Sequence, residues 1–123
     1  MPDQRIILVV DDEELMRIAL TRALETLDGG IAVVEADNPS SALALADRLH
    51  PDLIISDVVM GNGTGNLLRH LLRSNPLTAS IPVIMMSGYA DETVEWGSDP
   101  EVLYLKKPFS AAILLDTVKQ MIA

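Results

Sequence analysis

Short apolar runs alternate with stretches of helical periodicity along this chain, and this alternation constrains the fold more than any other feature of the sequence. Residues 5–10 (RIILVV) form a continuous β-branched run, which is typical of a strand buried on both faces. Similar runs follow at residues 31–36, 52–56, 81–87 and 102–105. Helical segments separate these runs, so the sequence predicts an α/β fold with a parallel sheet and helices on both faces.

The intervening segments predict helices at residues 13–27, 40–49, 66–74 and 110–123, and at most a short helix at residues 90–96. Asn38-Pro39 is a helix-start signal, because a capping side chain precedes a proline in the first turn. The pair Gly29-Gly30 is expected to end the first helix. The residues of that helix that fall near helical spacing are Leu15, Ile18, Ala19, Arg22 and Leu24.

Length and composition indicate one domain spanning residues 1–123 and exclude several other classes of protein. The chain has 49% hydrophobic residues but no apolar run near the ~20 residues that a membrane-spanning helix needs. It lacks a signal-peptide pattern and has no cysteine, which together favour the cytoplasm. The net charge of −9 repels nucleic-acid phosphates and fits a divalent cation or a basic protein surface better.

Polar side chains follow the predicted strands at the points where they end. In an open parallel sheet the functional crevice lies at the carboxyl ends of the strands. Three carboxylates, a hydroxyl and an ammonium are therefore expected to converge there. They are Asp11 and Asp12 after the first strand, Asp57 after the third, Ser87 after the fourth, and Lys107 after the fifth, where the neighbouring Lys106 is expected to be exposed.

This set of residues predicts metal-assisted phosphoryl chemistry. Two carboxylates ~4 Å apart repel by about 4 kcal/mol at an effective dielectric near 20. A divalent cation offsets that repulsion, and ligands that are all oxygen, with room for water, suit Mg²⁺. A phosphoryl group bound by the ion, Lys107 and Ser87 could then be attacked by Asp57 to form an acyl phosphate.

Four motifs in order give the chain a resemblance to the receiver domain of response regulators in two-component signalling. They are VVDDEE after the first strand, DLIISDVVMGNGTG around Asp57, IPVIMMSGYAD around Ser87, and LYLKKPF at the fifth strand. The likeness extends over essentially the whole chain. It implies the flavodoxin-like (βα)5 sheet with strand order 2-1-3-4-5.

The resemblance also implies a role for individual residues. Asp57 would be the phosphoacceptor, and Lys107, which precedes a Pro108 that is often cis in the family, would bind the phosphate. Mg²⁺ would be held by Asp12, Asp57 and the Val59 carbonyl directly and by Asp11 through water. Ser87 and Tyr104 would form the switch.

The resemblance implies partners as well. The phosphoryl group would come from a phosphohistidine of a histidine kinase or a histidine phosphotransfer protein. The output would be a change in the face formed by the fourth helix, fifth strand and fifth helix, read by an output domain or a homodimer. The compact segment between Ser87 and Lys107 resembles receivers of hybrid histidine kinases more than those with DNA-binding domains.

Other classes of function are open at this point. An aspartate-nucleophile phosphatase would want an acid two residues after Asp57, where Val59 stands, so the chain is expected to catalyse only its own phosphorylation and dephosphorylation. A pseudo-receiver, acting as an interaction module without phosphorylation, would lack Asp57, Lys107 or the acid pair. A flavin-binding protein of this fold would want aromatic flanks and fewer acids. The stretch GNGTG lacks the ending of a P-loop and predicts a flexible turn.

Two positions near Asp57 predict a long phosphorylated lifetime. Val59 offers no polar side chain to an attacking water, and Tyr89 could with Val59 restrict that water. Separately, Gly61 replaces the proline usual after Met60 in the family, so a more mobile loop is expected after Asp57. We therefore expect Val59→Asn to shorten the lifetime of the phosphorylated protein, measured as loss of radiolabelled phosphate. An unchanged lifetime in this variant would contradict the prediction.

Overall fold

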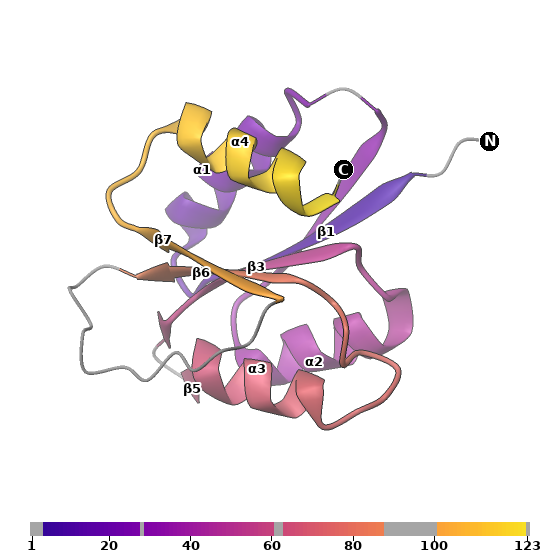
Figure 1. The fold of residues 1–123 in the computed structure, drawn as a ribbon. Helices are drawn as coiled ribbons and strands as arrows, with labels where there is room; N and C mark the ends of the chain where they lie inside the picture. Colours follow the sequence, from indigo (N-terminus) through magenta and orange to yellow (C-terminus); the bar gives the residue numbers. More distant parts are fainter. Residues whose placement is uncertain (1–3, 28, 61–62, 88–100, 123) are drawn as a thin grey trace.

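Five strands form one parallel sheet in the order β2-β1-β3-β6-β7 (Figure 1). This computed structural model describes residues 4–27, 29–60, 63–87 and 101–122, with the backbone alone for 59–60 and 63–66. The predicted strand order 2-1-3-4-5 is confirmed, and the first two strands have the predicted bounds. The strands are β1 Arg5–Val10, β2 Ile31–Ala36, β3 Leu53–Asp57, β6 Val83–Ser87 and β7 Val102–Lys106.

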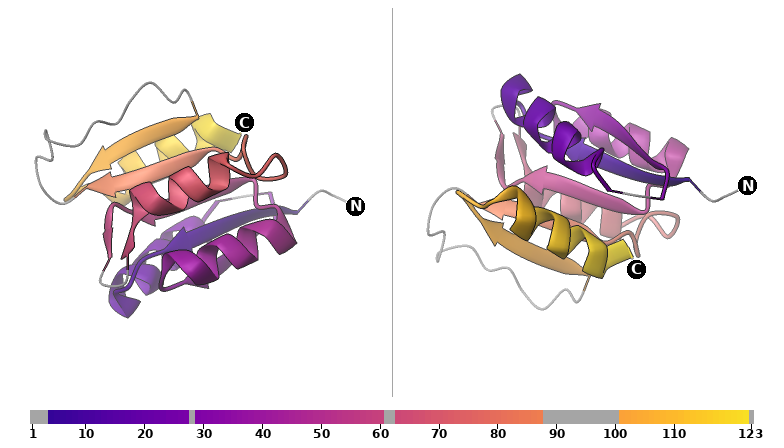
Figure 2. Two further views of the ribbon diagram at one scale, coloured as in Figure 1. Left: turned by 90° about the horizontal axis from the view of Figure 1, so that it is seen from below. Right: turned by 90° about the horizontal axis from the view of Figure 1, so that it is seen from above.

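Helices cover both faces of this sheet, as parallel strands require for their crossover connections. In Figures 1 and 2, α1 and α4 lie on one face, and α2 and α3 lie on the other. The helices in the described residues are α1 Glu14–Leu24, α2 Pro39–Leu49, α3 Gly65–Arg73 and α4 Ala111–Ile122. None of them is long and apolar enough to cross a lipid bilayer. The expected short helix at residues 90–96 lies outside the described residues.

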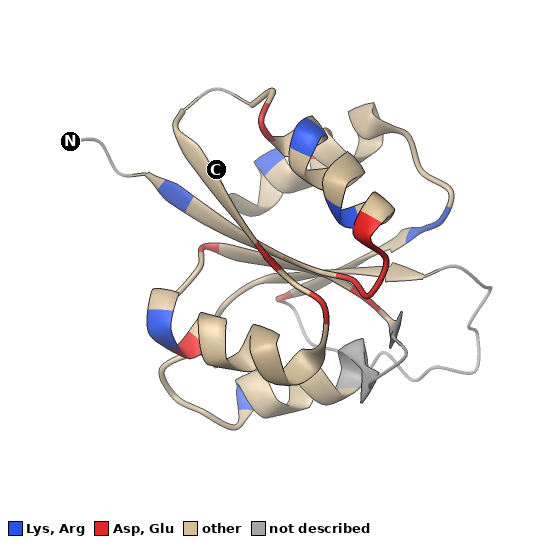
Figure 3. Ribbon diagram, turned by 180° about the vertical axis from the view of Figure 1, so that it is seen from behind, with Lys and Arg blue, Asp and Glu red and all other residues tan. Residues whose placement is uncertain are grey.

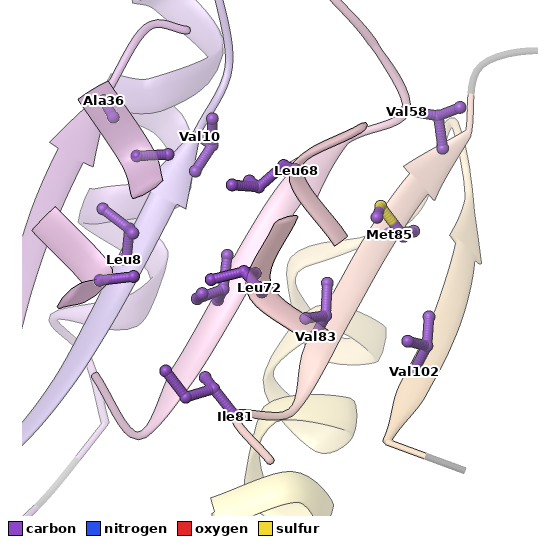
Figure 4. Close-up of a cluster of buried hydrophobic side chains, with 13 residues drawn as sticks. Leu8, Val10, Ala36, Val58, Leu68, Leu72, Ile81, Val83, Met85 and Val102 are labelled. Atoms are coloured by element: carbon purple, nitrogen blue, oxygen red, sulfur yellow. The ribbon is translucent and has the colours of Figure 1, made fainter. Parts of the chain in front are cut away.

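The core has two layers because side chains alternate between the faces of each strand. Leu8 and Val10 pack with Leu68 and Leu72 under α2 and α3 (Figure 4). The neighbouring residues Ile7 and Val9 pack on the other face under α1 and α4. Strand β3 is buried along its whole length. This burial explains why the strands read as continuous apolar runs.

Helix α2 begins and ends as the sequence predicts. The Asn38 side chain accepts a hydrogen bond from the Ser41 amide at 2.8 Å, and Pro39 occupies the first turn. His50 ends the helix in a left-handed conformation with φ of 50°, and its amide donates to the Ala46 carbonyl at 2.9 Å. These contacts satisfy backbone groups that the helix ends would otherwise leave unpaired.

Helix α1 ends earlier than predicted, and only part of its apolar surface is buried. It ends at Leu24, and Gly29 and Gly30 lie beyond it with positive φ, in the turn that leads to β2. Leu20 and Leu24 are buried, but Leu15 is 81% exposed and Ile18 is 36% exposed. Helical spacing therefore groups the exposed Leu15 and Ile18 with the buried Leu24, so spacing alone does not show which residues face the sheet.

The glycine-rich stretch after Asp57 also differs from the prediction of a simple turn. Strands β4 Val59–Met60 and β5 Gly63–Thr64 pair antiparallel, with Val59 opposite Thr64, and Gly65 begins α3. Strands of two residues are too short to show alternation in the sequence, so periodicity could not predict them.

Candidate functional site

The carboxyl ends of the strands bring the predicted acids to one edge of the sheet. Asp11 and Asp12 follow β1, and Asp57 ends the adjacent β3. Figure 3 shows acidic segments gathered where the central strands end, near the start of α1. Backbone hydrogen bonds keep these strand ends level with each other. They run from the Asp11 amide to Ala36 (3.1 Å), from the Val58 amide to Met86 (2.9 Å) and from the Lys107 amide to Ser87 (2.7 Å).

The three acids form one group of possible ligands. A carboxylate oxygen from each of Asp11, Asp12 and Asp57 lies within 4.8 Å of the other two. Asp11 is fully buried, Asp57 is 8% exposed, and Asp12 is open to solvent. The group therefore has a buried floor and an open side, through which a small ligand can reach Asp57.

Lys107 provides the cation that faces these acids. Its Nζ donates to Oδ2 of Asp57 at 3.1 Å, and both side chains are largely buried. The peptide bond between Lys107 and Pro108 is cis. Lys106 is exposed, as expected from the opposite directions of consecutive side chains in a strand. The charge of the Lys107 ammonium is smaller than that of the three carboxylates, so these four side chains together are negative.

The two oxygens of the Asp11 carboxylate differ in their hydrogen bonding. Its Oδ1 accepts a hydrogen bond from the Glu13 amide at 2.9 Å. Its Oδ2 is buried and has no hydrogen-bond partner among the described residues. Burial raises the pKa of Asp11 from 3.8 to about 6, the Asp57 carboxylate adds to the rise, and the Glu13 amide and Lys107 oppose it.

These residues fit a hard divalent cation. Mg²⁺ takes oxygen ligands, usually from one or two carboxylates with several waters. The cluster offers only carboxylate oxygens, and the bare, buried Oδ2 of Asp11 would gain a partner of opposite charge. An exposed Asp12 leaves room for water on the open side.

Ser87 and Tyr104 lie near each other on the other side of Asp57. Ser87 ends β6 and is 7% exposed, and Tyr104 lies on the neighbouring β7 directly opposite Met85. Met85 and Ser87 are two residues apart, so both side chains and that of Tyr104 lie on the α2/α3 face. Tyr104 is partly buried there.

The remaining predicted positions, Val59, Gly61 and Tyr89, have no described side chain. Val59 begins β4, with its backbone alone described, so its carbonyl remains a predicted ligand. Gly61 and Tyr89 lie outside the described residues.

The sequence reasoning missed an ion pair next to the acids. Arg17 of α1 donates from Nε to Oε1 of Glu35 at 3.0 Å and from Nη1 to the Asp11 carbonyl at 2.6 Å. Thr21 also donates to Glu35, at 3.2 Å. A signal existed in the sequence, because Glu35 is the only charged residue in the apolar strand at residues 31–36.

Comparison with known proteins gives consistent matches over this chain. The family model described as response regulator receiver domain matches residues 7–119. The sensor kinase CckA of Brucella abortus is 36% identical over 121 residues, which are 94% of this chain and 12% of CckA. The phosphate regulon transcriptional regulatory protein PhoB of Pseudomonas aeruginosa is 33% identical over 96% of this chain and 52% of PhoB.

A solved structure agrees with these relatives. The chemotaxis response regulator CheY4 of Vibrio cholerae superimposes with a TM-score of 0.83 at 27% identity, covering 97% of this chain and 99% of CheY4. The chain spans about half of PhoB and a small part of CckA. A sensor kinase and a transcriptional regulator match at similar identity, so the likeness to hybrid-kinase receivers stays a prediction.

The raised pKa of Asp11 predicts how the stability of the metal-free protein depends on pH. Between pH 3.8 and 6 the folded state binds more protons than the unfolded state, so the free energy of unfolding falls as the pH rises. This carboxyl contributes a loss of about 1 kcal/mol between pH 5 and pH 7. Urea unfolding in EDTA at the two pH values should show the loss in the wild type and not in Asp11→Asn.

The exposed Asp116 of α4 provides a matched control. Asp116→Asn should keep the pH dependence of the wild type. If Asp11→Asn keeps it equally, Asp11 is not the group responsible.

Proposed function

The chain belongs to the response regulator receiver domain family, and on that premise we propose that it accepts a phosphoryl group on Asp57 from a protein phosphohistidine. The observation that carries the proposal is the contact of Lys107 Nζ with Asp57 Oδ2 at 3.1 Å, beside the carboxylates of Asp11 and Asp12. This arrangement supports the proposal that Asp57 is the nucleophile, Lys107 the cation that meets the phosphoryl group, and the acids the metal ligands.

In the proposed reaction, an oxygen of Asp57 attacks the phosphorus of the donor. A P–O bond forms to Asp57 as the P–N bond breaks, and the electron pair of that bond leaves with the donor imidazole. Lys107 stays close enough to neutralise charge on the phosphoryl oxygens as they arrive, and Ser87 can donate its hydroxyl to one of them.

Asp11, Asp12, Asp57 and the Val59 carbonyl are proposed to hold Mg²⁺, which when bound supplies positive charge to the phosphoryl oxygens and positions them. Lys107 alone cannot balance three carboxylates and an incoming phosphoryl group.

The signal is proposed to leave the site through Ser87 and Tyr104. Their side chains share one face of the sheet on adjacent strands, so a shift of the Ser87 hydroxyl toward a phosphoryl group would free space beside Tyr104. Movement of Tyr104 would alter the surface around β7, the described strand of the predicted output face. An output domain or a second copy of the chain would read that change.

Two alternatives are less well supported. A pseudo-receiver would not need Asp57, Lys107 and the acid pair in one place, whereas all four lie together here. A phosphatase that acts on other molecules would need a general acid two residues after Asp57, where the chain has Val59. We therefore propose catalysis only of the protein's own phosphorylation and dephosphorylation.

Intact mass spectrometry after incubation with acetyl phosphate and Mg²⁺ tests the proposed chemistry. The wild type should gain one phosphoryl group, and Asp57→Asn and a sample with EDTA should gain none. Lys107→Gln should slow the gain, because it removes the cation at Asp57, while the adjacent, exposed Lys106→Gln should not. If the wild type also gains no mass and fails to bind beryllofluoride, the pseudo-receiver alternative is favoured.

The exposed face of α1 is proposed as the docking surface for the phosphodonor protein. Leu15 and Ile18 project from the helix that begins just after the acids. Beside them, an apolar groove runs between α1 and α4 and is lined by Met16, Ala19, Ala23, Phe109 and Ala111, with Lys107 and Pro108 at its border. Because this surface adjoins the Asp57 site, a helix seated on it could present a histidine to Asp57.

Glutamate at Leu15 tests this docking surface. With a phosphorylated histidine kinase that labels the wild type, selected from a panel of purified kinases, Leu15→Glu should slow transfer at least tenfold, since a charge would be buried. The rate with acetyl phosphate should stay unchanged. Leu77→Glu, at a position 67% exposed beyond α3, is the matched control. Equal transfer rates for both variants would place the donor elsewhere.

A further inference from the structure

Hydrogen bonds made by Asp11, Glu13 and the guanidinium of Arg17 fix the connection between β1 and α1. The Asp11 amide donates to Ala36 at 3.1 Å, and the Glu13 amide donates to Asp11 Oδ1 at 2.9 Å. The Asp11 carbonyl accepts from Arg17 Nη1 at 2.6 Å. Glu13, at the start of α1, makes no capping hydrogen bond with its own side chain. The connection therefore depends on contacts with Asp11 and Arg17.

The position of the Arg17 guanidinium is itself fixed. Its Nε donates to Glu35 Oε1 at 3.0 Å, and Thr21 holds the other oxygen of that carboxylate at 3.2 Å. Glu35 lies on β2 directly opposite Val9 of β1. The side chain of Arg17 is only 16% exposed. A planar guanidinium can donate in two directions at once, to Glu35 and to Asp11, which an ammonium group does less well.

We propose that Arg17, oriented by Glu35, is a positioning residue that holds the β1–α1 connection so that the Asp11 and Asp12 carboxylates face the metal. Asp11 offers one oxygen to the Glu13 amide and leaves the other bare toward the cluster, so a rotation of its backbone would withdraw that oxygen. Groups that orient metal ligands commonly change metal affinity 10- to 100-fold when removed. This inference rests on the proposed binding of Mg²⁺.

The direction in which the Mg²⁺ affinity changes when Arg17 is replaced distinguishes a positioning role from a purely electrostatic one. Arg17 is a cation near an acidic site, so its removal would strengthen Mg²⁺ binding if charge alone mattered. If Arg17 instead positions the ligands, its removal should weaken Mg²⁺ binding. The exposed Arg22, on the same helix, offers a variant with the same change in net charge and no contact with the connection.

Calorimetric titration of the full chain with Mg²⁺ is the test. Arg17→Gln should raise the dissociation constant about 10-fold, and Arg22→Gln should leave it as in the wild type. Arg17→Lys keeps the charge and should also bind more weakly, which gives a second variant if Arg17→Gln folds poorly. Binding by Arg17→Gln or Arg17→Lys that equals or exceeds that of the wild type would overturn the positioning role alone. A wild type that does not bind Mg²⁺ would overturn the proposed function itself.

Amide hydrogen exchange of the metal-free protein provides a readout that does not depend on the ion. The Glu13 amide is bonded to Asp11 Oδ1, so loosening the connection should speed its exchange in Arg17→Gln and not in Arg22→Gln. Equal exchange of this amide in the wild type and in Arg17→Gln would contradict the role of Arg17 in holding Asp11.

Discussion

Mutual repulsion of carboxylates at the end of the central strands is the constraint to which the rest of the structure responds. Asp11, Asp12 and Asp57 place oxygens within 4.8 Å of one another, with one ammonium beside them. A close pair of such charges repels by about 4 kcal/mol at an effective dielectric near 20. The strands that carry these acids bury Ile7, Leu8, Val9, Val10, Leu53, Ile54 and Ile55 almost completely. Burial of these side chains stabilises the strands and so holds the acids at this edge of the sheet.

The apolar pattern that supplies this burial is also what made the fold predictable. Continuous runs at residues 5–10 and 31–36 gave the observed bounds of β1 and β2. β1 is largely buried and has no polar face to obscure the run, whereas β2 is a half-buried edge strand that is still mostly apolar. The site followed from the fold, since parallel strands end at one edge. The sequence pattern failed for the end of α1, which lies at Leu24 and not at Leu27. It also failed for β4 and β5, which are too short to have a period.

The residues missed at the site share a physical reason. Arg17 and Glu35 act on Asp11 through a backbone carbonyl and through each other, and neither supplies an atom to the acid cluster. The strand-end rule does place Glu35 near the carboxyl end of the second strand, away from the centre of the sheet, but it gives Glu35 no partner, because Arg17 lies within a helix. Only the register of β1 with β2 and the path of α1 bring them together. The only sign of this pair in the sequence of the strand is the single charged residue, Glu35, within the apolar run at residues 31–36.

The two faces of helix α1 therefore have different roles. Its inner face, with Leu20 and Leu24, fixes it to the sheet, and Arg17 links its first turn to Asp11. Its outer face leaves Leu15 and Ile18 in solvent beside the groove shared with α4. A partner that seats on the outer face would contact the same helical turn that holds Asp11. Docking of the phosphodonor and the geometry of the metal ligands would then be coupled through one rigid element, with no need for a longer path across the domain.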